Sequence, residues 1–196
     1  RYLDVMCESL DEALEQVIAA RDRREPLSVG LLANAADVLP ELVQRRIVPD
    51  ILTDQTSAHD VLNGYVPHGL AYEEALALRT ADPERYKKMA RQSIVRHVEA
   101  MLALQRLGAV AFDYGNNIRG EALDNGLKNA FDIPGFVPEY IRPLFCLGKG
   151  PFRWAALSGE ADETYATDDA LLRTFPENGA LRRWISKAQK HVQFQG

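Results

Sequence analysis

A polar stretch at residues 53–65, TDQTSAHDVLNGY, brings a glutamine, hydroxyl groups, a histidine and two aspartates together. Ser57, His59 and Asp60 are the residue types of a nucleophile, a base and an orienting acid. Triad partners usually meet across a fold rather than within four residues, and no G-x-S-x-G elbow occurs in the chain. We therefore expect this stretch to act as a rim of hydrogen-bonding groups, and we keep a hydrolase that uses Ser57 or His59 as an alternative.

The histidines give no clear metal site. His59, Asp60 and His68 lack any recognised ligand spacing. His97 lies in a helical pattern and His191 near the end of the sequence, and both are expected to be structural or solvated. A carboxamide, hydroxyls, an imidazole and backbone N–H groups at residues 55–59 suit the phosphates and ribose hydroxyls of a nucleotide better than a metal.

The elements that must position these groups alternate between helical patterns and short apolar runs. Residues 9–25 have apolar side chains at helical spacing and stop before Pro26. Residues 27–33 and 48–54 are apolar runs typical of buried strands, and residues 34–46 between them form a helical pattern that Asn34 can cap. This order predicts a parallel, right-handed βαβ unit.

The remaining sequence continues the alternation. Residues 72–108 read as helix with a break at Asp82-Pro83 and a stop at Gly108, residues 109–114 read as a strand, and residues 118–126 as a short helix. Residues 131–133 are a candidate fourth strand, and two helices split by residues 176–179 end the chain. The predicted fold is α/β, with an open, mainly parallel sheet flanked by helices and a helical, Pro- and Gly-rich C-terminal portion.

Polar loops follow three of the predicted strands: ANAAD, DQTSAHD and DYGNN. Ligands of open α/β sheets bind beyond the carboxyl ends of the strands, so we expect these loops to meet at one edge. Each loop also has a plainer interpretation, since Asn34 could only cap a helix and residues 114–117 could only form a turn. No G-x-G-x-x-G follows a predicted strand, so either the ligand is not a dinucleotide or the glycine turn lies outside this sequence.

Composition narrows the class of protein. The net charge of −5 and the scattered Lys and Arg residues argue against nucleic acid as a partner, and no run is long and apolar enough to span a membrane. Cys7 and Cys146 form no disulfide framework and are expected to be small buried residues in a cytoplasmic protein. Because the sequence starts at Arg1 and stops at Gly196, we interpret it as an internal segment of a longer chain.

Four stretches, DQTSAHDVLNGY, FDYGNNIR, GFVPEYIRPLFC and GPFRWAALSG, resemble the urocanase (urocanate hydratase) family, and the similarity runs from Arg1 to Gly196. The resemblance implies one Rossmann-like NAD-binding domain over residues 1–196, which is part of a longer, homodimeric subunit. It also implies a lyase of histidine catabolism that adds water to urocanate to give imidazolonepropionate. In this reaction NAD+ acts as an electrophile rather than as a hydride carrier.

Carried over by position, the resemblance implies a set of NAD contacts in three loops. They are Asn34, Ala35, Gln55, Thr56, Ser57, Ala58, His59, Tyr65, Val66 and Tyr114. The family often has other residues at Ala33, Val61 and Val66, and none of these changes removes a polar group.

The family's glycine-rich phosphate turn is expected before Arg1 and its active-site cysteine after Gly196. No residue of this segment is therefore assigned a catalytic role, and the segment alone is expected to be inactive. A non-catalytic nucleotide-binding module that kept the fold is the alternative.

Overall fold

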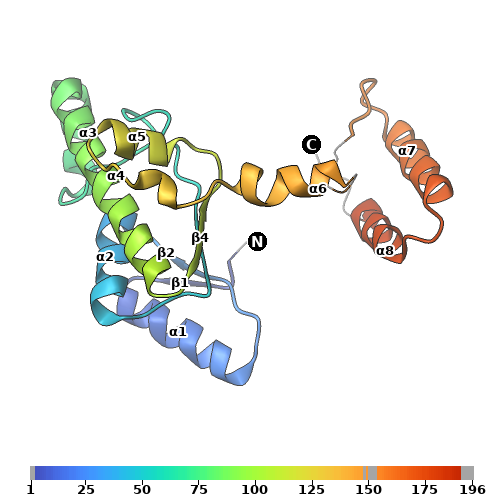
Figure 1. The fold of residues 1–196 in the computed structure, drawn as a ribbon, viewed down its shortest axis with the longest axis horizontal. Helices are drawn as coiled ribbons and strands as arrows, with labels where there is room; N and C mark the ends of the chain where they lie inside the picture. Colours follow the sequence, from blue (N-terminus) through green and yellow to red (C-terminus); the bar gives the residue numbers. More distant parts are fainter. Residues whose placement is uncertain (1–2, 148, 150–153, 191–196) are drawn as a thin grey trace. The chain divides into compact units, whose positions relative to one another are not determined.

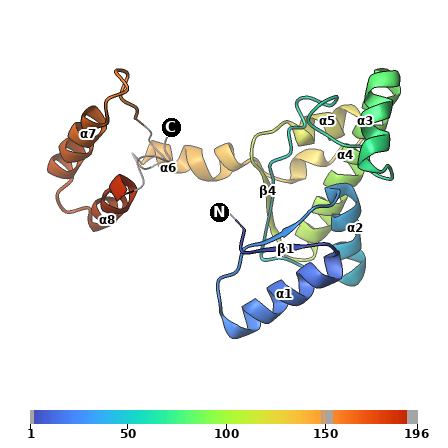
Figure 2. The ribbon, with the colours of Figure 1, turned by 180° about the vertical axis from the view of Figure 1, so that it is seen from behind.

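The computed structural model describes residues 3–147, 149 and 154–190. These fall into two compact units, Arg1–Leu147 and Gly148–Gly196, where the sequence had suggested a single domain. The first unit is an α/β arrangement of short parallel strands and packed helices, and the second is helical (Figures 1 and 2).

The first unit opens with a parallel strand pair joined by one helix. Strand β1 (Val5–Cys7) leads into α1 (Leu10–Arg23) and then β2 (Val29–Leu31), with Val5 opposite Val29. Helix α1 begins where the Ser9 hydroxyl accepts a hydrogen bond from the Glu12 N–H at 3.2 Å. It ends at Arg24, whose left-handed backbone is typical of a C-terminal cap.

A second parallel pair carries the polar loops. Strand β3 (Ile51–Asp54) and strand β4 (Val110–Asp113) are paired in register, and the crossover between them contains α3 (Tyr72–Ala81) and α4 (Pro83–Arg106). Asp82 separates the two helices and caps α4 through the Arg85 N–H at 3.0 Å, which confirms the predicted break. Gly108 has a φ of +117° and lets the chain turn from α4 into β4.

Helix α4 is the centre of the first unit. It packs against α3, against α5 (Ile118–Asp124) and against α2 (Ala35–Arg45) (Figure 1). The residues of its inner face are buried. The core combines residues of α4 and α5 with residues of the loop that follows β3: Ala58, Val61, Tyr65, Tyr86, Ala90, Ile94, Val98, Met101, Ile118 and Ala122. The loop after β3 is thus anchored in the core.

The strand pairing corrects two predictions. The expected βαβ unit over residues 27–54 does not form, because β2 pairs with β1 and β3 pairs with β4, giving two two-stranded sheets in the described residues. The three-residue β1 is too short to register as a strand in the sequence pattern. Residues 131–133 are not a strand either, since a 3-10 helix (Ala130–Asp132) turns the chain there and only Gly135 bridges to Asp113.

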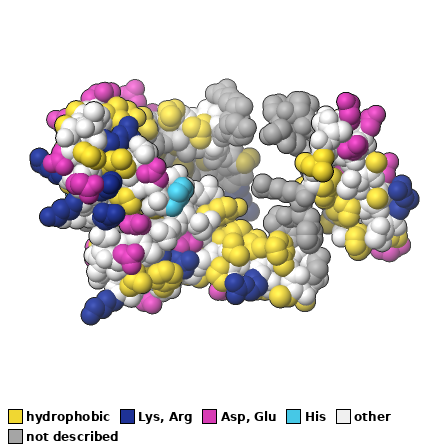
Figure 3. Space-filling view, turned by 90° about the horizontal axis from the view of Figure 1, so that it is seen from above, with side chains coloured by type: hydrophobic (Ala, Val, Ile, Leu, Met, Phe, Trp, Pro, Cys, Tyr) yellow, Lys and Arg dark blue, Asp and Glu magenta, His cyan; other side chains and the backbone are white. Residues whose placement is uncertain are grey.

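A short helical segment ends the first unit. It consists of a π-helical turn, η2 (Val137–Ile141), and α6 (Arg142–Cys146). Its exposed apolar side chains are Val137, Leu144, Phe145 and Leu147. Hydrophobic side chains gather over this part of the surface in Figure 3. Cys146 is exposed here, contrary to prediction, because few other elements pack on α6, whereas Cys7 is buried as predicted.

The second unit contains α7 (Ala161–Thr174) and α8 (Gly179–Ala188), the two helices predicted on either side of residues 176–179. Buried Asp168 of α7 accepts a hydrogen bond from the Gln189 side chain at 2.9 Å. Among the described residues of both units, no helix has the length and apolar character needed to cross a membrane.

Candidate functional site

A pocket opens at the carboxyl ends of β3 and β4, where an open α/β fold places its ligands. Its volume is about 280 Å³. One wall is the loop after β3 and the other is the loop after β4. The lining residues are Gln55, Thr56, Ser57, His59, Tyr114, Gly115 and Asn116.

Three side chains of the first wall are free to bind a ligand. Gln55, Ser57 and His59 are exposed, and within the described part of the chain their side chains make no hydrogen bond. A carboxamide, a hydroxyl and an imidazole can donate or accept, so they suit a ligand rich in hydroxyl and phosphate oxygens.

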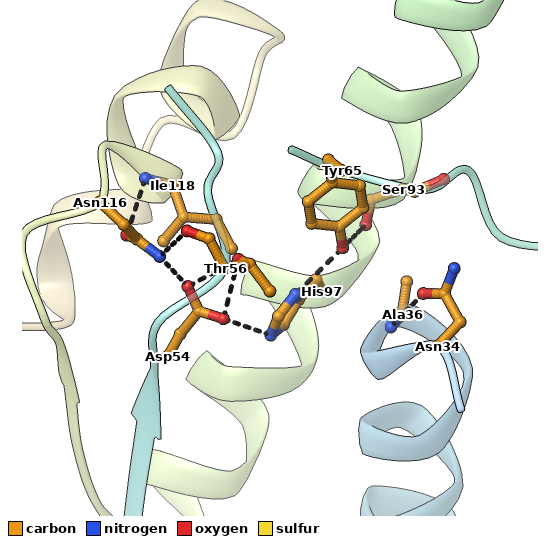
Figure 4. Close-up of polar contacts among 9 residues, drawn as sticks. All are labelled: Asn34, Ala36, Asp54, Thr56, Tyr65, Ser93, His97, Asn116 and Ile118. Atoms are coloured by element: carbon orange, nitrogen blue, oxygen red, sulfur yellow. Dashed lines mark hydrogen bonds and ion pairs between the residues drawn. The ribbon is translucent and has the colours of Figure 1, made fainter. Parts of the chain in front are cut away.

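The two walls are joined by Asn116. Its side-chain nitrogen donates to the Asp54 carboxylate and to the Thr56 carbonyl oxygen, the latter at 2.7 Å (Figure 4). Its side-chain oxygen accepts from the Ile118 N–H at 3.2 Å, at the start of α5. The Tyr114 N–H adds a backbone bond to the Asp54 carbonyl at 3.2 Å.

Asp54 is a buried carboxylate beneath this pocket, with 5% of its surface exposed. It accepts from the Thr56 hydroxyl at 2.9 Å and faces Nε2 of buried His97 at 3.6 Å. Nδ1 of His97 lies 3.0 Å from the Tyr65 hydroxyl. Figure 4 shows this chain of groups running from the pocket floor into the core.

Burial controls the charge of these groups. It lowers the pKa of His97, and the Asp54 carboxylate offsets only part of that effect. The imidazole is therefore neutral near pH 7. With its proton on Nε2, which faces Asp54, its Nδ1 accepts a hydrogen bond from the Tyr65 hydroxyl. Burial also raises the pKa of Tyr65, with Asp54 and Asp37 adding to the rise, so that hydroxyl stays protonated.

We expect the protein to become less stable as the pH is lowered, because of His97. Below about pH 6.5 the histidine of the unfolded chain takes up a proton, whereas the buried ring of the folded protein does not. The contribution of His97 to the free energy of unfolding is therefore complete above that pH and is lost as the pH falls toward the lowered pKa of the folded state. Urea unfolding between pH 7.5 and 5.5 should show a flatter decline for His97→Gln than for the unchanged protein. Equal slopes would contradict this role for His97.

Asp113 occupies the position on β4 that Asp54 occupies on β3, since the two residues are register partners. It is buried and pairs with Arg119, and its carboxylate also accepts from the Gly115 N–H at 3.0 Å. Arg119 donates to the Ile133 carbonyl at 2.9 Å and lies 4.7 Å from the centre of the Phe131 ring. This pair holds the start of the second pocket wall.

Tyr114 presents an aromatic ring to the pocket. It is half-exposed and stacks on Phe136, with ring centres 4.7 Å apart and planes inclined by 18°. Phe136 in turn stacks on Phe112, and Tyr140 meets both rings. The ring of Tyr114 is thereby held in one orientation while part of its surface stays open.

The ten predicted contact residues fall into three groups. Five line the pocket: Gln55, Thr56, Ser57, His59 and Tyr114. Ala58 and Tyr65 have side chains in the core, so only their backbone can reach a ligand. Asn34, Ala35 and Val66 do not line the pocket. The Asn34 side chain donates to the Val66 carbonyl at 2.9 Å and caps α2 through the Ala36 N–H at 2.9 Å.

The separation of the Asn34 loop has a physical cause. It follows β2, which belongs to the other two-stranded sheet, so its strand end is not beside those of β3 and β4. The hydrogen bond between Asn34 and Val66 still ties it to the long loop after β3. The capping role weighed from the sequence is therefore confirmed, and the convergence of all three loops at one pocket is not.

The remaining alternatives find no support in the geometry. Asp60 is engaged within its own loop by Asn63, first through the backbone N–H and then through the side chain, which lowers the pKa of Asp60. It therefore does not orient His59 as a triad acid would. In the described residues no three acidic, histidine or cysteine side chains gather as a metal site would need.

Sequence reasoning missed the groups that shape the pocket: Asp54, His97, Asp113, Asn116 and Arg119. A signal was present for the two acids, because each ends a strand made mainly of apolar residues. Asn116 lies in the DYGNN loop that was singled out, yet its partner 62 positions earlier leaves no local trace.

Parallel strands with a polar pocket at their carboxyl ends have the arrangement in which open α/β domains bind their ligands. Comparison with protein families agrees. Residues 1–140 match the urocanase Rossmann-like domain, and residues 143–196 match the urocanase C-terminal domain. The chain belongs to the urocanase family. The boundary between these two matches lies close to the division between the compact units.

Proposed function

We propose that this chain forms the NAD-binding part of a urocanate hydratase, a hydro-lyase of histidine catabolism. One observation carries the proposal: five residues that the family resemblance implies as NAD contacts, from loops about 60 positions apart, line a single pocket. Within the described residues, the side chains of three of them, Gln55, Ser57 and His59, make no hydrogen bond.

The residues present fit a nucleotide. Gln55, Ser57 and His59 would bind its phosphate and hydroxyl oxygens, and the open surface of Tyr114 would contact a planar ring. Oxidised nicotinamide, when bound, supplies an electrophile for the imidazole ring of urocanate. The contribution of this chain is to hold and orient the cofactor. We also propose that the full protein is a cytoplasmic homodimer with urocanate as its substrate.

The test uses the full-length gene product. Acid denaturation should release about one NAD per subunit, and urocanate should lose its ultraviolet absorbance in the presence of the native protein. The double variant Ser57→Ala/His59→Ala should retain NAD about ten- to a hundredfold less tightly, because two hydrogen bonds of about 1 kcal/mol each are lost. Gln16→Ala, on an exposed face of α1, is the control and should leave retention unchanged.

Two outcomes would favour other functions. NAD bound without any conversion of urocanate would favour a non-catalytic nucleotide-binding module. Normal NAD content with turnover abolished in the double variant would favour a direct chemical role for Ser57 or His59.

A further inference from the structure

The two walls of the pocket come from loops separated by about 60 positions, and few bonds hold them together. Among the described residues, the hydrogen bonds that cross between them near the pocket are the Tyr114 N–H to the Asp54 carbonyl and the two donated by Asn116. Asn116 thus supplies every side-chain bond in this set.

The hydrogen-bonding capacity of the Asn116 side chain is matched closely by its surroundings. Its two N–H groups go to Asp54 and the Thr56 carbonyl, and its oxygen accepts from Ile118. Only a carboxamide offers two donors and an acceptor in this geometry. An aspartate of the same size would keep the bond from Ile118, lose both donors and face Asp54 with a second negative charge.

Asp54 is a firm anchor for this contact. It is the last residue of β3, it is buried, and its backbone is fixed by pairing with Asp113. The Thr56 hydroxyl donates to the same carboxylate, so Asp54 fixes both the start of the first wall and the side chain that reaches from the second.

We propose that Asn116, anchored by Asp54, is the positioning residue that sets the separation of the two pocket walls and so controls cofactor affinity. The role in affinity rests on the proposed function, since it takes NAD as the ligand. The Asn116 contact acts on the pocket through two lining residues. Asn116 donates to the Thr56 carbonyl in the first wall and lies two residues after Tyr114 in the second wall.

The experiment is a charge-swap cycle in the full-length protein, with NAD as the probe. Asn116→Asp should weaken NAD binding about a hundredfold, because two hydrogen bonds are replaced by repulsion between carboxylates. Asp54→Asn should weaken it about tenfold. In Asp54→Asn/Asn116→Asp the amide at position 54 can donate to the carboxylate at position 116, so binding should be at least tenfold tighter than in Asn116→Asp.

Amide hydrogen exchange over residues 55–59 and 114–116 of the cofactor-free protein gives an independent measurement. Exchange should be faster in Asn116→Asp and slower again in the double variant. Asn125→Asp is the matched control, because Asn125 is exposed at the end of α5 and does not line the pocket; NAD affinity should stay within about threefold of the unchanged protein, and exchange over both loops should not change.

Two results would overturn the inference: NAD affinity and loop exchange unchanged in Asn116→Asp, or a double variant no better than Asn116→Asp in both measurements. If the unchanged protein binds no NAD, the proposed function fails instead, and the exchange data alone decide whether Asn116 holds the walls together.

Discussion

Replacing Gly64 by alanine will disrupt the loop that forms the first pocket wall. A Cβ at this position would lie 2.1 Å from the Ser57 carbonyl oxygen and 2.8 Å from the Asp60 carbonyl oxygen. Both atoms are backbone, so a side-chain rotation cannot relieve the overlap. We expect a loss of about 3 kcal/mol in the free energy of unfolding and the loss of detectable cofactor binding.

Urea unfolding and NAD retention in the full-length protein measure these two effects. Gly179→Ala is the matched control, since the nearest atom to its new Cβ is the flexible Arg183 guanidinium at 3.4 Å. That variant should stay within about 0.5 kcal/mol of the unchanged protein. A Gly64→Ala protein with normal stability and cofactor content would show that the loop can adopt another backbone path.

Removing the charge of Arg119 will destabilise the first unit by about 3–5 kcal/mol, because Asp113 would be left buried without a cation. Arg119→Met keeps much of the side-chain length and so isolates the loss of charge and hydrogen bonds. The Ile133 carbonyl also loses its donor in this variant. Thermal and urea unfolding measure the change.

The double variant Asp113→Asn/Arg119→Met should recover part of this loss, since a neutral amide is less costly to bury than an unpaired carboxylate. Arg21→Met provides the surface control, because Arg21 and Asp22 are both largely exposed and their ion pair contributes at most about 1 kcal/mol. If the double variant were no more stable than Arg119→Met, the cost would come from packing around Arg119 rather than from the unpaired charge.

Local features of the fold could be predicted because their causes are local. Asn34 and Asp82 cap helices with their own side chains, and Gly108 supplies the backbone freedom for a turn. The break between α3 and α4, the end of α4 and the division between α7 and α8 followed from such signals. Strand pairing could not be predicted in the same way, because strands of three or four residues carry too little pattern to choose a partner.

The residues of the site also differ in whether a local sequence pattern identifies them. The lining residues at 55–59 were identifiable, because a run of polar groups follows an apolar strand and resembles the family. The Asp54 to Asn116 contact was not identifiable, since it requires knowing that β3 and β4 lie side by side in register. The Asp113 to Arg119 pair was accessible in principle, because its residues are six positions apart on the two sides of one turn.

The in-register pairing of Asp54 with Asp113 determines where this chain can change in length during evolution. Within the crossover between them, the junction of α3 and α4 lies outside both walls, so a change of length there leaves the pocket lining in place. A single-residue insertion inside Ile51–Asp54 or Val110–Asp113 has the opposite effect, since it turns alternate side chains to the other face of the strand. Such an insertion would separate Asn116 from its anchor while leaving every residue of the pocket present in the sequence.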